Sequence, residues 1–538
     1  MLTTEIRNKV QSLWSRLWSG GFSNPISAIE QISYLLFMKR LENFHADTPQ
    51  EYKWSHYHKI KGNDLIPHIK GKVFPYIKTQ LAREGDPFAD AMEDASFRIN
   101  DPTLLEDAIK SIDDIYTEIE RQEAEDNQHF QDIQGDVYEH LLKQTSEAGK
   151  NGQFRTPRHI IQMMAEMLDP DLDGKICDLA CGSGGFLVGA YQYIITKYSS
   201  QKEEDVNGLP KGIDGDLLTE EQKNKLKQNT FYGFDIDQTM VRIATMNLMM
   251  HGITRPDITH LDTLSDRYEQ YEVDRYVEIW KKENENEPVL EIDDEKRLEI
   301  SAEKYRYILA NPPFTGKINS LTISENLNRA YQPKYKDEER VSQTVQSELL
   351  FLERIIFMLE EGGKAAVIVP EGLLYNSGSA HKTVRQVLMT DCDLEGVVSL
   401  PEGVFMPYTG VKTSILLFKK GQWRNNQPQE TKVWFYNMKS DGYSLDANRR
   451  RLKDQPLPEA IKGWKDRDDE DQSDRKLQHF AIPYEEIAQN GFELNFNLYQ
   501  DFIYEPNGYR EPKEILEQLN SLETEILKGL EEIRAYEF

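Results

Sequence analysis

Apolar side chains recur at helical spacing through the first part of the chain. The first stripe consists of Ile6, Val10, Leu13 and Leu17. Gly20 and Gly21 are expected to end this helix, and Asn24 followed by Pro25 is typical of the start of the next. A further helix is predicted near residues 133–142. The pattern therefore predicts a helical N-terminal domain over residues 1–145.

Between residues 150 and 420, short apolar runs alternate with helical stripes, which is typical of a parallel sheet with crossover helices. The predicted strands are Lys175–Leu179, Thr230–Phe234, Ile258–Leu261, Tyr307–Ala310, Ala365–Val369, Leu394–Ser399 and Thr413–Phe418. The predicted helices are Phe186–Tyr198, Gln238–His251, Ser347–Glu360 and Ser379–Thr390. We expect an α/β domain over residues 146–425, interrupted by polar insertions near 199–228 and 274–300. The second insertion is strongly acidic and is expected to be a solvated excursion.

After residue 425 the chain is charged and irregular as far as Asp474, and it closes with a helix after Pro512. The apolar stripe of that helix consists of Ile515, Leu519, Leu522, Ile526, Leu530 and Ile533. Such a stripe suits packing against another helix, in this chain or in another one. We therefore expect a C-terminal extension over residues 426–538 that ends in a helix with one apolar face.

The net charge of the chain limits the kinds of partner that it can bind without help. The chain has 64 Lys and Arg against 92 Asp and Glu, a net charge of −28. A protein that grips DNA alone usually has a basic face, because neutralising phosphates supplies most of the affinity. A DNA enzyme this acidic should borrow much of its grip from a basic partner. The alternative is that the acidity serves solubility alone.

The absence of certain sequence features predicts where the protein is located and whether it binds a metal. It contains no run of eighteen apolar residues and no basic start followed by an apolar stretch, so neither a membrane span nor a secretory signal is expected. Only three cysteines occur, which favours a cytoplasmic protein without a disulfide scaffold. Cys177 and Cys181 lack a second pair or clustered histidines, so we expect no metal site.

A glycine loop follows the first predicted strand and opens a helix. It reads Asp178-Leu179-Ala180-Cys181-Gly182-Ser183-Gly184-Gly185-Phe186. Glycines here let the backbone bend sharply and approach a nucleotide-like cofactor at the carboxyl ends of the strands. The dinucleotide fingerprint would need a glycine where Leu187 stands, so the sequence disfavours a nicotinamide cofactor. Alone, such a loop can also be an ordinary tight turn.

Acidic residues end the next two predicted strands. Asp235 is placed to accept hydrogen bonds from two ribose hydroxyls, as acids do at this strand end in nucleotide sites. Its distance from the glycine loop is longer than usual because of the insertion at 199–228. Asp262 could reach the adenine end of a cofactor or the target base, or it could simply cap a helix. The methionine-rich stretch Met240–Met250 between them favours core packing.

The fourth predicted strand ends in Asn311-Pro312-Pro313-Phe314. The two prolines remove backbone donors and stiffen the loop, and the side chain of Asn311 adds an acceptor. Phe314 supplies a flat apolar face for stacking. Two hydrogen bonds from a planar amine to fixed acceptors favour a pyramidal nitrogen whose lone pair can attack a methyl group on a sulfonium. The ordinary alternative is a strand that ends in a proline turn.

Together, Asp178–Leu187 and Asn311–Phe314 resemble the cofactor and catalytic motifs of amino-group methyltransferases. The cytosine-N4 enzymes typically carry serine before the two prolines, so Asn311 favours adenine N6. The resemblance implies a Rossmann-like S-adenosylmethionine-dependent methyltransferase sheet. It also implies that the target adenine is flipped out of the DNA duplex, and that Asn311, Pro312, Pro313 and Phe314 are catalytic.

Further segments resemble the methylation subunits of type I restriction-modification systems. They are Gly152–Arg158, Ile308–Ala310, Gly363–Pro370, Leu400–Phe405 and Lys412–Phe418. Family members typically show Gln-Tyr-Phe-Thr-Pro where this chain has Gln153-Phe154-Arg155-Thr156-Pro157, a segment implied to close over the methionine end of the cofactor. The cofactor contacts that the resemblance implies come from Gln153, Phe154, Arg155, Thr156, Pro157, Asp178, Ala180, Cys181, Gly182, Ser183, Gly184, Phe186, Asp235, Ile236, Asp262 and Thr263.

The same resemblance implies an assembly. It implies a helical N-terminal domain that senses target methylation and a C-terminal helix that docks on a DNA-specificity subunit. Two methylation subunits would join one specificity subunit, and a separate restriction subunit would supply the motor and nuclease. No phosphate-binding loop of the motor type occurs in this chain, which agrees with that division of labour.

Three other interpretations remain open at this point. A stand-alone amino-group methyltransferase acting on RNA or on protein glutamine would use the same motif, although such enzymes look shorter. A scaffold that keeps the fold without binding a cofactor is opposed by the intact glycines, Asp235 and Asn311–Phe314. A nicotinamide oxidoreductase is disfavoured by Leu187 and by the two prolines.

Overall fold

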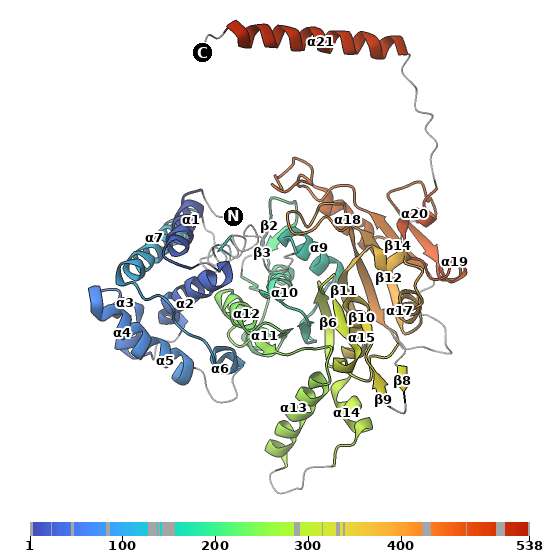
Figure 1. The fold of residues 1–538 in the computed structure, drawn as a ribbon. Coiled ribbons are helices and arrows are strands. Elements are labelled where there is room, and N and C mark those ends of the chain that lie inside the picture. Colours follow the sequence, from blue (N-terminus) through green and yellow to red (C-terminus); the bar gives the residue numbers. More distant parts are fainter. Residues whose placement is uncertain are drawn as a thin grey trace. The chain divides into compact units, whose positions relative to one another are not determined.

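The fold is described from a computed structural model of the chain (Figure 1). The described residues are 4–22, 24–44, 48–81, 87–126, 137, 140–141, 156–212, 214–284, 291–314, 316–329, 334–336, 339–421, 432–469, 471–501 and 512–535. The chain divides into two units, Met1–Tyr499 and Gln500–Phe538. The helix expected near 133–142 falls largely outside the described residues, as do Gln153, Phe154 and Arg155.

Helices form the N-terminal part, as the apolar stripe predicts. They are α1 (Thr4–Ser19), α2 (Pro25–Phe44), α3 (Trp54–Tyr57), α4 (Leu65–His68), α5 (Phe74–Tyr76), α6 (Pro87–Met92) and α7 (Pro102–Asp126), with short 3-10 and π turns at Gln50–Tyr52, Gly62–Asp64, Ile69–Val73 and Ile77–Leu81. Gly21 follows α1 with a φ of +106°, a conformation that glycine adopts without strain. Asn24 Oδ1 accepts the backbone N–H of Ile26 at 3.0 Å. Both predicted helix boundaries are therefore confirmed.

A nine-stranded sheet forms the centre of the first unit, in the order β15-β14-β12-β13-β11-β6-β1-β4-β5. Its strands are β1 (Ile176–Asp178), β4 (Phe231–Asp235), β5 (Asp257–His260), β6 (Tyr305–Ala310), β11 (Leu359–Pro370), β12 (Cys392–Ser399), β13 (Thr413–Lys420), β14 (Lys432–Asn437) and β15 (His479–Pro483). Each of the strands predicted from sequence overlaps one of these. Strands β11, β6, β1, β4 and β5 run parallel to one another.

The expected parallel arrangement holds for the strands from β11 to β5, whereas the other part of the sheet is mixed: β13 runs antiparallel to both β11 and β12, and β15 runs antiparallel to β14. A parallel return needs a crossover, usually a helix. Residues 400–412, which join β12 to β13, contain turns and no helix, so the chain returns in the opposite direction.

Helices cover both faces of the sheet, and the strands alternate between them. Ile176, Leu309 and Ala366 point into one buried cluster, whereas their neighbours Cys177, Ile308 and Ala365 point into the other. The first face is covered by α9 (Arg158–Leu168), α10 (Gly185–Lys197), α12 (Gln238–Met250) and α18 (Pro456–Lys465). The second face is covered by α15 (Ser347–Met358), α16 (Gly372–Tyr375), α17 (Ser379–Thr390), α19 (Tyr484–Gln489) and α20 (Phe496–Tyr499). Because both faces are buried, the strands read as nearly continuous apolar runs.

Helix α12 lies between the N-terminal helices and the sheet. Its methionines Met240, Met246 and Met250 are buried with the N-terminal helices, which confirms the expected core packing. On its opposite side, Ala244 and Leu248 are buried against the sheet and α10. The helix therefore belongs to two apolar cores at once.

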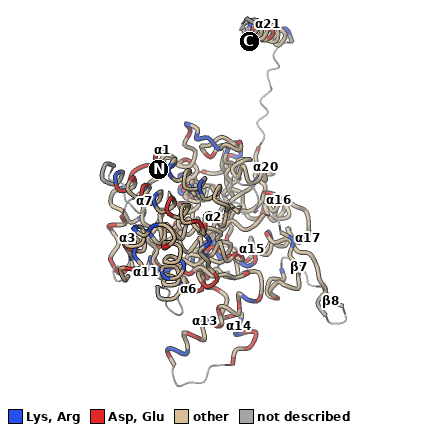
Figure 2. Tube along the Cα trace, turned by 60° about the vertical axis from the view of Figure 1, so that its left-hand side comes forward, with Lys and Arg blue, Asp and Glu red and all other residues tan. Residues whose placement is uncertain are grey.

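Smaller elements form the insertions. They are the hairpin β2 (Lys202–Glu204) and β3 (Pro210–Gly212), α11 (Glu220–Gln228), α13 (Arg267–Glu283), α14 (Asp294–Ser301), β7 (Lys317–Asn319), the turn Ser320–Thr322, β8 (Lys334–Lys336), β9 (Glu339–Val341) and β10 (Thr344–Gln346). Figure 1 shows α13 and α14 as a helical pair that extends from the body, so the acidic excursion is partly helical. Acidic and basic residues are interspersed along the chain (Figure 2).

The first part of the predicted C-terminal extension belongs to the central sheet. Strands β14 and β15 lie beyond residue 425 and extend the same sheet, although the sequence pattern there was charged and irregular. The second unit contains α21 (Pro512–Ala535), the helix predicted after Pro512. No helix among the described residues combines the length and the apolar character needed to cross a membrane.

Candidate active site

The glycine loop lies between the end of β1 and the start of α10. Gly182 and Gly184 have φ values of +52° and +78°, which side chains other than that of glycine rarely adopt. A Cβ added to Gly184 would lie 3.1 Å from Leu248 Cδ1, so this glycine lets the loop pack closely against α12. A Cβ added to Gly182 would meet nothing within 4 Å. The backbone is therefore open to a ligand at Gly182, next to the amino end of α10.

Asp235 ends β4, the strand beside β1. One of its carboxylate oxygens accepts the backbone N–H of Gly182 at 2.9 Å, and the other accepts the N–H of Asp237 at 2.8 Å. Burial raises the pKa of Asp235, while these two N–H groups act in the opposite direction. A carboxylate oxygen can accept more than one hydrogen bond, so Asp235 can hold the glycine loop and still accept from ribose hydroxyls.

Asp178 lies at the end of β1 and is almost fully buried. Its Oδ1 accepts the N–H of Ala180 at 3.1 Å. Burial, helped by the nearby charge of Asp235, raises the pKa of Asp178 to about 8, although the bond from Ala180 opposes the shift. Asp178 therefore stabilises the conformation of the glycine loop from a buried position.

Asp262 and Thr263 follow β5. Asp262 Oδ1 accepts the N–H of Leu264 at 3.0 Å, so its side chain closes a local turn and does not cap a helix, since α13 begins only at Arg267 with Asp266 at its N-cap. Thr263 donates to the carbonyl of Leu179 at 3.3 Å and thereby ties this turn to the glycine loop. Next to Asp235, the side chain of Ile236 is 72% exposed. An exposed apolar side chain at this strand end could pack against a planar ring.

Asn311 directly follows β6, on the other side of β1. Its Nδ2 donates to Thr156 Oγ1 at 3.0 Å. Its Oδ1 is buried and has no hydrogen-bond partner among the described residues. Burying an acceptor without a partner is unfavourable, so this oxygen is available to a donor beyond the described residues.

The aromatic end of the motif is packed more tightly than the sequence suggests. Phe314 is only 4% exposed, and its ring meets that of Phe405 at 87° with centroids 5.6 Å apart. Pro312 is buried and Pro313 is exposed. The edge-to-face contact fixes the angle of the Phe314 ring.

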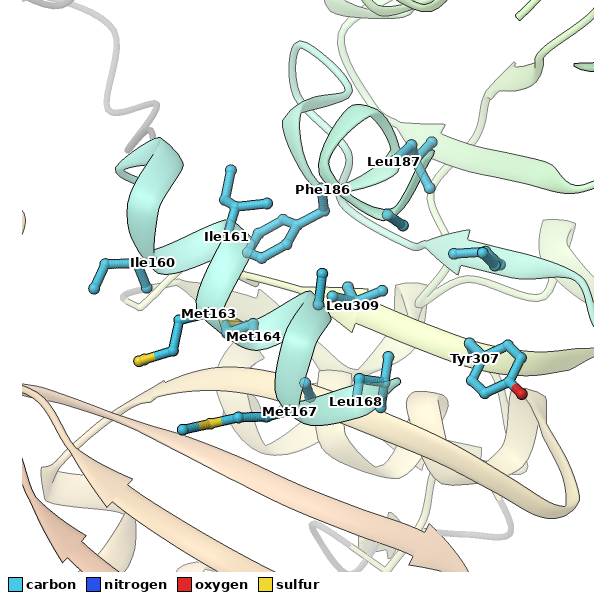
Figure 3. Close-up of a cluster of buried hydrophobic side chains, with 14 of the residues drawn as sticks. Ile160, Ile161, Met163, Met164, Met167, Leu168, Phe186, Leu187, Tyr307 and Leu309 are labelled. Atoms are coloured by element: carbon cyan, nitrogen blue, oxygen red, sulfur yellow. The ribbon is translucent and has the colours of Figure 1, made fainter. Parts of the chain in front are cut away.

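Phe186 lies at the start of α10 and is buried. Figure 3 shows its ring directed toward Ile161 of α9, within the core on the first face of the sheet. Cys181 and Phe314 belong to the same buried cluster. Phe186 therefore packs in the core beside the glycine loop and holds the start of α10 in place.

The strand order brings these groups to one edge of the sheet. β6, β1 and β4 are consecutive and parallel, with Cys177 paired to Ile308 and Asp178 paired to Gly233. Neighbouring strands lie about 5 Å apart, so the ends of β6 and β4 are separated by roughly 10 Å. Asn311, the glycine loop and Asp235 thus share the carboxyl edge, where open α/β sheets bind their ligands.

Three contributors were missed from the sequence. Asn247 Nδ2 of α12 donates to the carbonyl of Ser183 at 2.8 Å. Asp237 caps α12 and donates its own N–H to Asp235. Phe405 packs on Phe314. A polar residue within a methionine-rich helix was the one available signal for Asn247. The segment Leu400–Phe405 was noted for its resemblance to the family, but nothing in it indicated that Phe405 packs on Phe314.

Comparisons with known proteins agree on the kind of fold. Residues 129–506 match the family model described as N-6 DNA Methylase, and residues 6–112 match the HsdM N-terminal domain. The EcoEI type I restriction enzyme methylase subunit of Escherichia coli is 27% identical over 94% of this chain and 92% of its own length. The MjaVIII type I methylase subunit of Methanocaldococcus jannaschii is 24% identical over 94% of this chain and 75% of its own. The structure of the type I restriction-modification methyltransferase subunit of Streptococcus thermophilus aligns with a TM-score of 0.61 at 17% identity, covering 92% and 99% of the two chains.

Proposed function

The chain belongs to the N-6 DNA methylase family, and we propose that it is the methylation subunit of a type I restriction-modification enzyme. It is an S-adenosylmethionine-dependent methyltransferase that acts on adenine N6 in DNA. The comparisons do not support the alternative of a stand-alone enzyme for RNA or protein glutamine. The observation that carries the catalytic proposal is the buried Oδ1 of Asn311, which has no hydrogen-bond partner within the part of the chain that the structure describes.

The residues at the carboxyl edge fit the methyl donor. Gly182 leaves room for close approach, Asp235 would accept the ribose hydroxyls, and Ile236 would cover the adenine ring together with Asp262. Thr156 and Pro157 precede α9, and with Gln153, Phe154 and Arg155 they would hold the methionine end. When bound, the donor supplies a methyl group on a sulfonium, which is already a good leaving group.

Asn311 would activate the target amine by accepting one of its N–H groups on Oδ1. The backbone carbonyl of Pro312 would accept the second, because the rigid proline pair fixes its direction. Phe314, whose buried ring is held at its angle by Phe405, would support the pocket that receives the flipped adenine. This arrangement works by positioning and electrostatics and requires no strongly basic side chain.

The partners follow from the subunit assignment. We propose that a specificity subunit supplies sequence recognition and much of the grip on DNA. The complex would also contain a second methylation subunit and a restriction subunit that carries the motor. A net charge of −28 suits a chain that leaves phosphate binding to another protein. We propose that the work takes place in the cytoplasm, where the DNA and the methyl donor are found.

The test is Asn311→Ala in the complex with the specificity subunit. The variant should bind S-adenosylmethionine with the affinity of the wild type, measured by calorimetric titration, and should lose methyl transfer to duplex adenine, measured with labelled donor. Normal turnover would contradict the role of Asn311. Loss of cofactor binding would instead place this side chain among the cofactor contacts.

A further inference from the structure

The carboxamide of Asn311 has two chemically different ends of nearly equal size. The oxygen accepts hydrogen bonds, whereas the nitrogen only donates. A target amine presents N–H groups, so a carboxamide turned by 180° would oppose donor to donor. The reaction therefore depends on which end faces the substrate, and the amide alone does not decide it.

The structure shows which end of the carboxamide Thr156 contacts. Asn311 Nδ2 donates to Thr156 Oγ1 at 3.0 Å, and Oδ1 is buried without a hydrogen-bond partner among the described residues. A hydroxyl can accept a hydrogen bond or donate one, so Thr156 selects the Nδ2 end only when its single proton is donated to another acceptor. No such acceptor occurs among the described residues, so the orientation is set once a bound group takes that proton.

We propose that Thr156 is the positioning residue that sets the orientation of the Asn311 carboxamide, with the oxygen turned toward the target amine. This inference rests on the proposed function. It would also link the two halves of the site: a bound methyl donor has a carboxylate that could accept the proton of the Thr156 hydroxyl, and the oxygen of that hydroxyl would then be left to accept from Asn311 Nδ2.

Thr156 is itself held in place. Pro157 follows it with a φ of −56° and is the N-cap of α9, and its carbonyl accepts the N–H groups of Ile160 and Ile161. Two residues later, His159 Nε2 lies 2.8 Å from Asp441 Oδ2, and Arg449 binds the same carboxylate. The ring of His159 also stacks on Tyr443 with centroids 4.5 Å apart. The start of α9 is thus anchored to the segment after β14.

A double-mutant cycle separates orientation from simple cofactor contact. Thr156→Val keeps the shape of the side chain but removes the hydroxyl, whereas Thr156→Ser keeps the hydroxyl. Asn311→Asp replaces the carboxamide by a group whose two ends both accept, so there is no orientation left to set. The four proteins, wild type, T156V, N311D and T156V/N311D, are assayed with T156S in the complex with the specificity subunit. The readouts are the rate of methyl transfer at saturating cofactor and the affinity for S-adenosylmethionine.

The proposal expects T156V to lower the saturated rate by about tenfold or more, and T156S to restore it. In the N311D background the same T156V substitution should cost much less. Equal losses from T156V in both backgrounds would overturn the proposal, because Thr156 would then act without reference to the amide. If N311D has no measurable rate, T156S and T156V decide alone, and equal rates for the two overturn the proposal. A wild-type complex that methylates no DNA adenine would refute the proposed function itself.

Discussion

Two aspartates at neighbouring strand ends have different tasks. Asp178 is enclosed by the loop it supports and receives one backbone N–H, whereas Asp235 receives two and lies closer to solvent. The sequence shows both as acids after a strand and does not separate them. Burial and the number of N–H donors decide which acid is available to a ligand.

Asp235→Ala should weaken S-adenosylmethionine binding by about 1–3 kcal/mol, the range expected when hydrogen bonds to a charged group are lost. Calorimetric titration measures the effect. Asp237→Asn is a matched control, since it removes a charge two residues away and keeps an oxygen that can cap α12. Unchanged affinity in the Asp235 variant would remove this residue from the site.

Asp178 predicts a pH dependence of stability. The folded protein holds the proton of Asp178 up to about pH 8, whereas the unfolded chain releases it near the ordinary pKa of 3.8. The raised pKa means that stability is highest at low pH and falls as the pH rises between these values, by at most about 1.4 kcal/mol per pH unit. Asp178→Asn keeps the acceptor for Ala180 and lacks the proton, so its melting temperature should rise relative to wild type between pH 5 and pH 8. Melting curves that stay parallel across this range would contradict the assignment.

At the scale of elements, the sequence predicted what repeats and missed what depends on distant neighbours. The apolar runs at Ala365–Val369 and Thr413–Phe418 gave β11 and β13, because both lie in the middle of the sheet. The apolar pattern did not predict whether these two strands run parallel or antiparallel. β15 was missed since it is a partly buried strand at the edge of the sheet, within a charged stretch.

The candidate site shows the same limit. The glycine loop, Asp235 and Asn311 could be found from local motifs, because each needs special chemistry at a fixed place after a strand. The bond from Asn311 to Thr156 and the contact from Phe405 to Phe314 join segments that are far apart in sequence. A periodic pattern carries no information about such pairs, so only the folded chain reveals them.

A buried ion pair joins the N-terminal helices to α12. Arg242 of α12 donates to Glu30 Oε1 of α2 at 2.8 Å, both side chains are at most 6% exposed, and Tyr34 also donates to Glu30. Arg242→Met should destabilise the protein by about 3–5 kcal/mol, because it leaves a buried carboxylate without its counter-charge. Thermal unfolding measures this. Adding Glu30→Gln removes the stranded charge and should recover part of the loss; no recovery would show that packing of the arginine stem dominates.

At the scale of the whole molecule, the chain is built to work in an assembly. Its second unit is a helix whose exposed apolar residues include Ile515, Leu516, Leu519, Leu522, Ile526, Leu527 and Leu530. The side chain of Ile533 lies outside those described. Exposing such a stripe to water is unfavourable, and a partner helix would cover it. The division into residues 1–145, 146–425 and 426–538 stays a prediction about function, while the sheet itself continues past residue 425.

Deleting residues 512–538 should abolish assembly with the specificity subunit and leave S-adenosylmethionine binding intact. Size-exclusion chromatography of the mixed subunits and titration of the isolated chain measure the two effects. Replacing Leu519 and Ile526 by glutamate is the matched test, since it keeps a helix but removes the apolar stripe. A truncated chain that still forms the complex would refute the docking role.

Helix α12 has a consequence for how the protein can change over evolutionary time. One side of it touches the N-terminal helices through Met240 and Met246, and the other forms the wall behind Gly184 through Ala244 and Leu248. A substitution in α12 that improves its packing against one neighbour also changes its packing against the other. Substitutions along this helix are therefore constrained from two sides, and replacing the N-terminal domain by a foreign one should disturb the packing of the glycine loop.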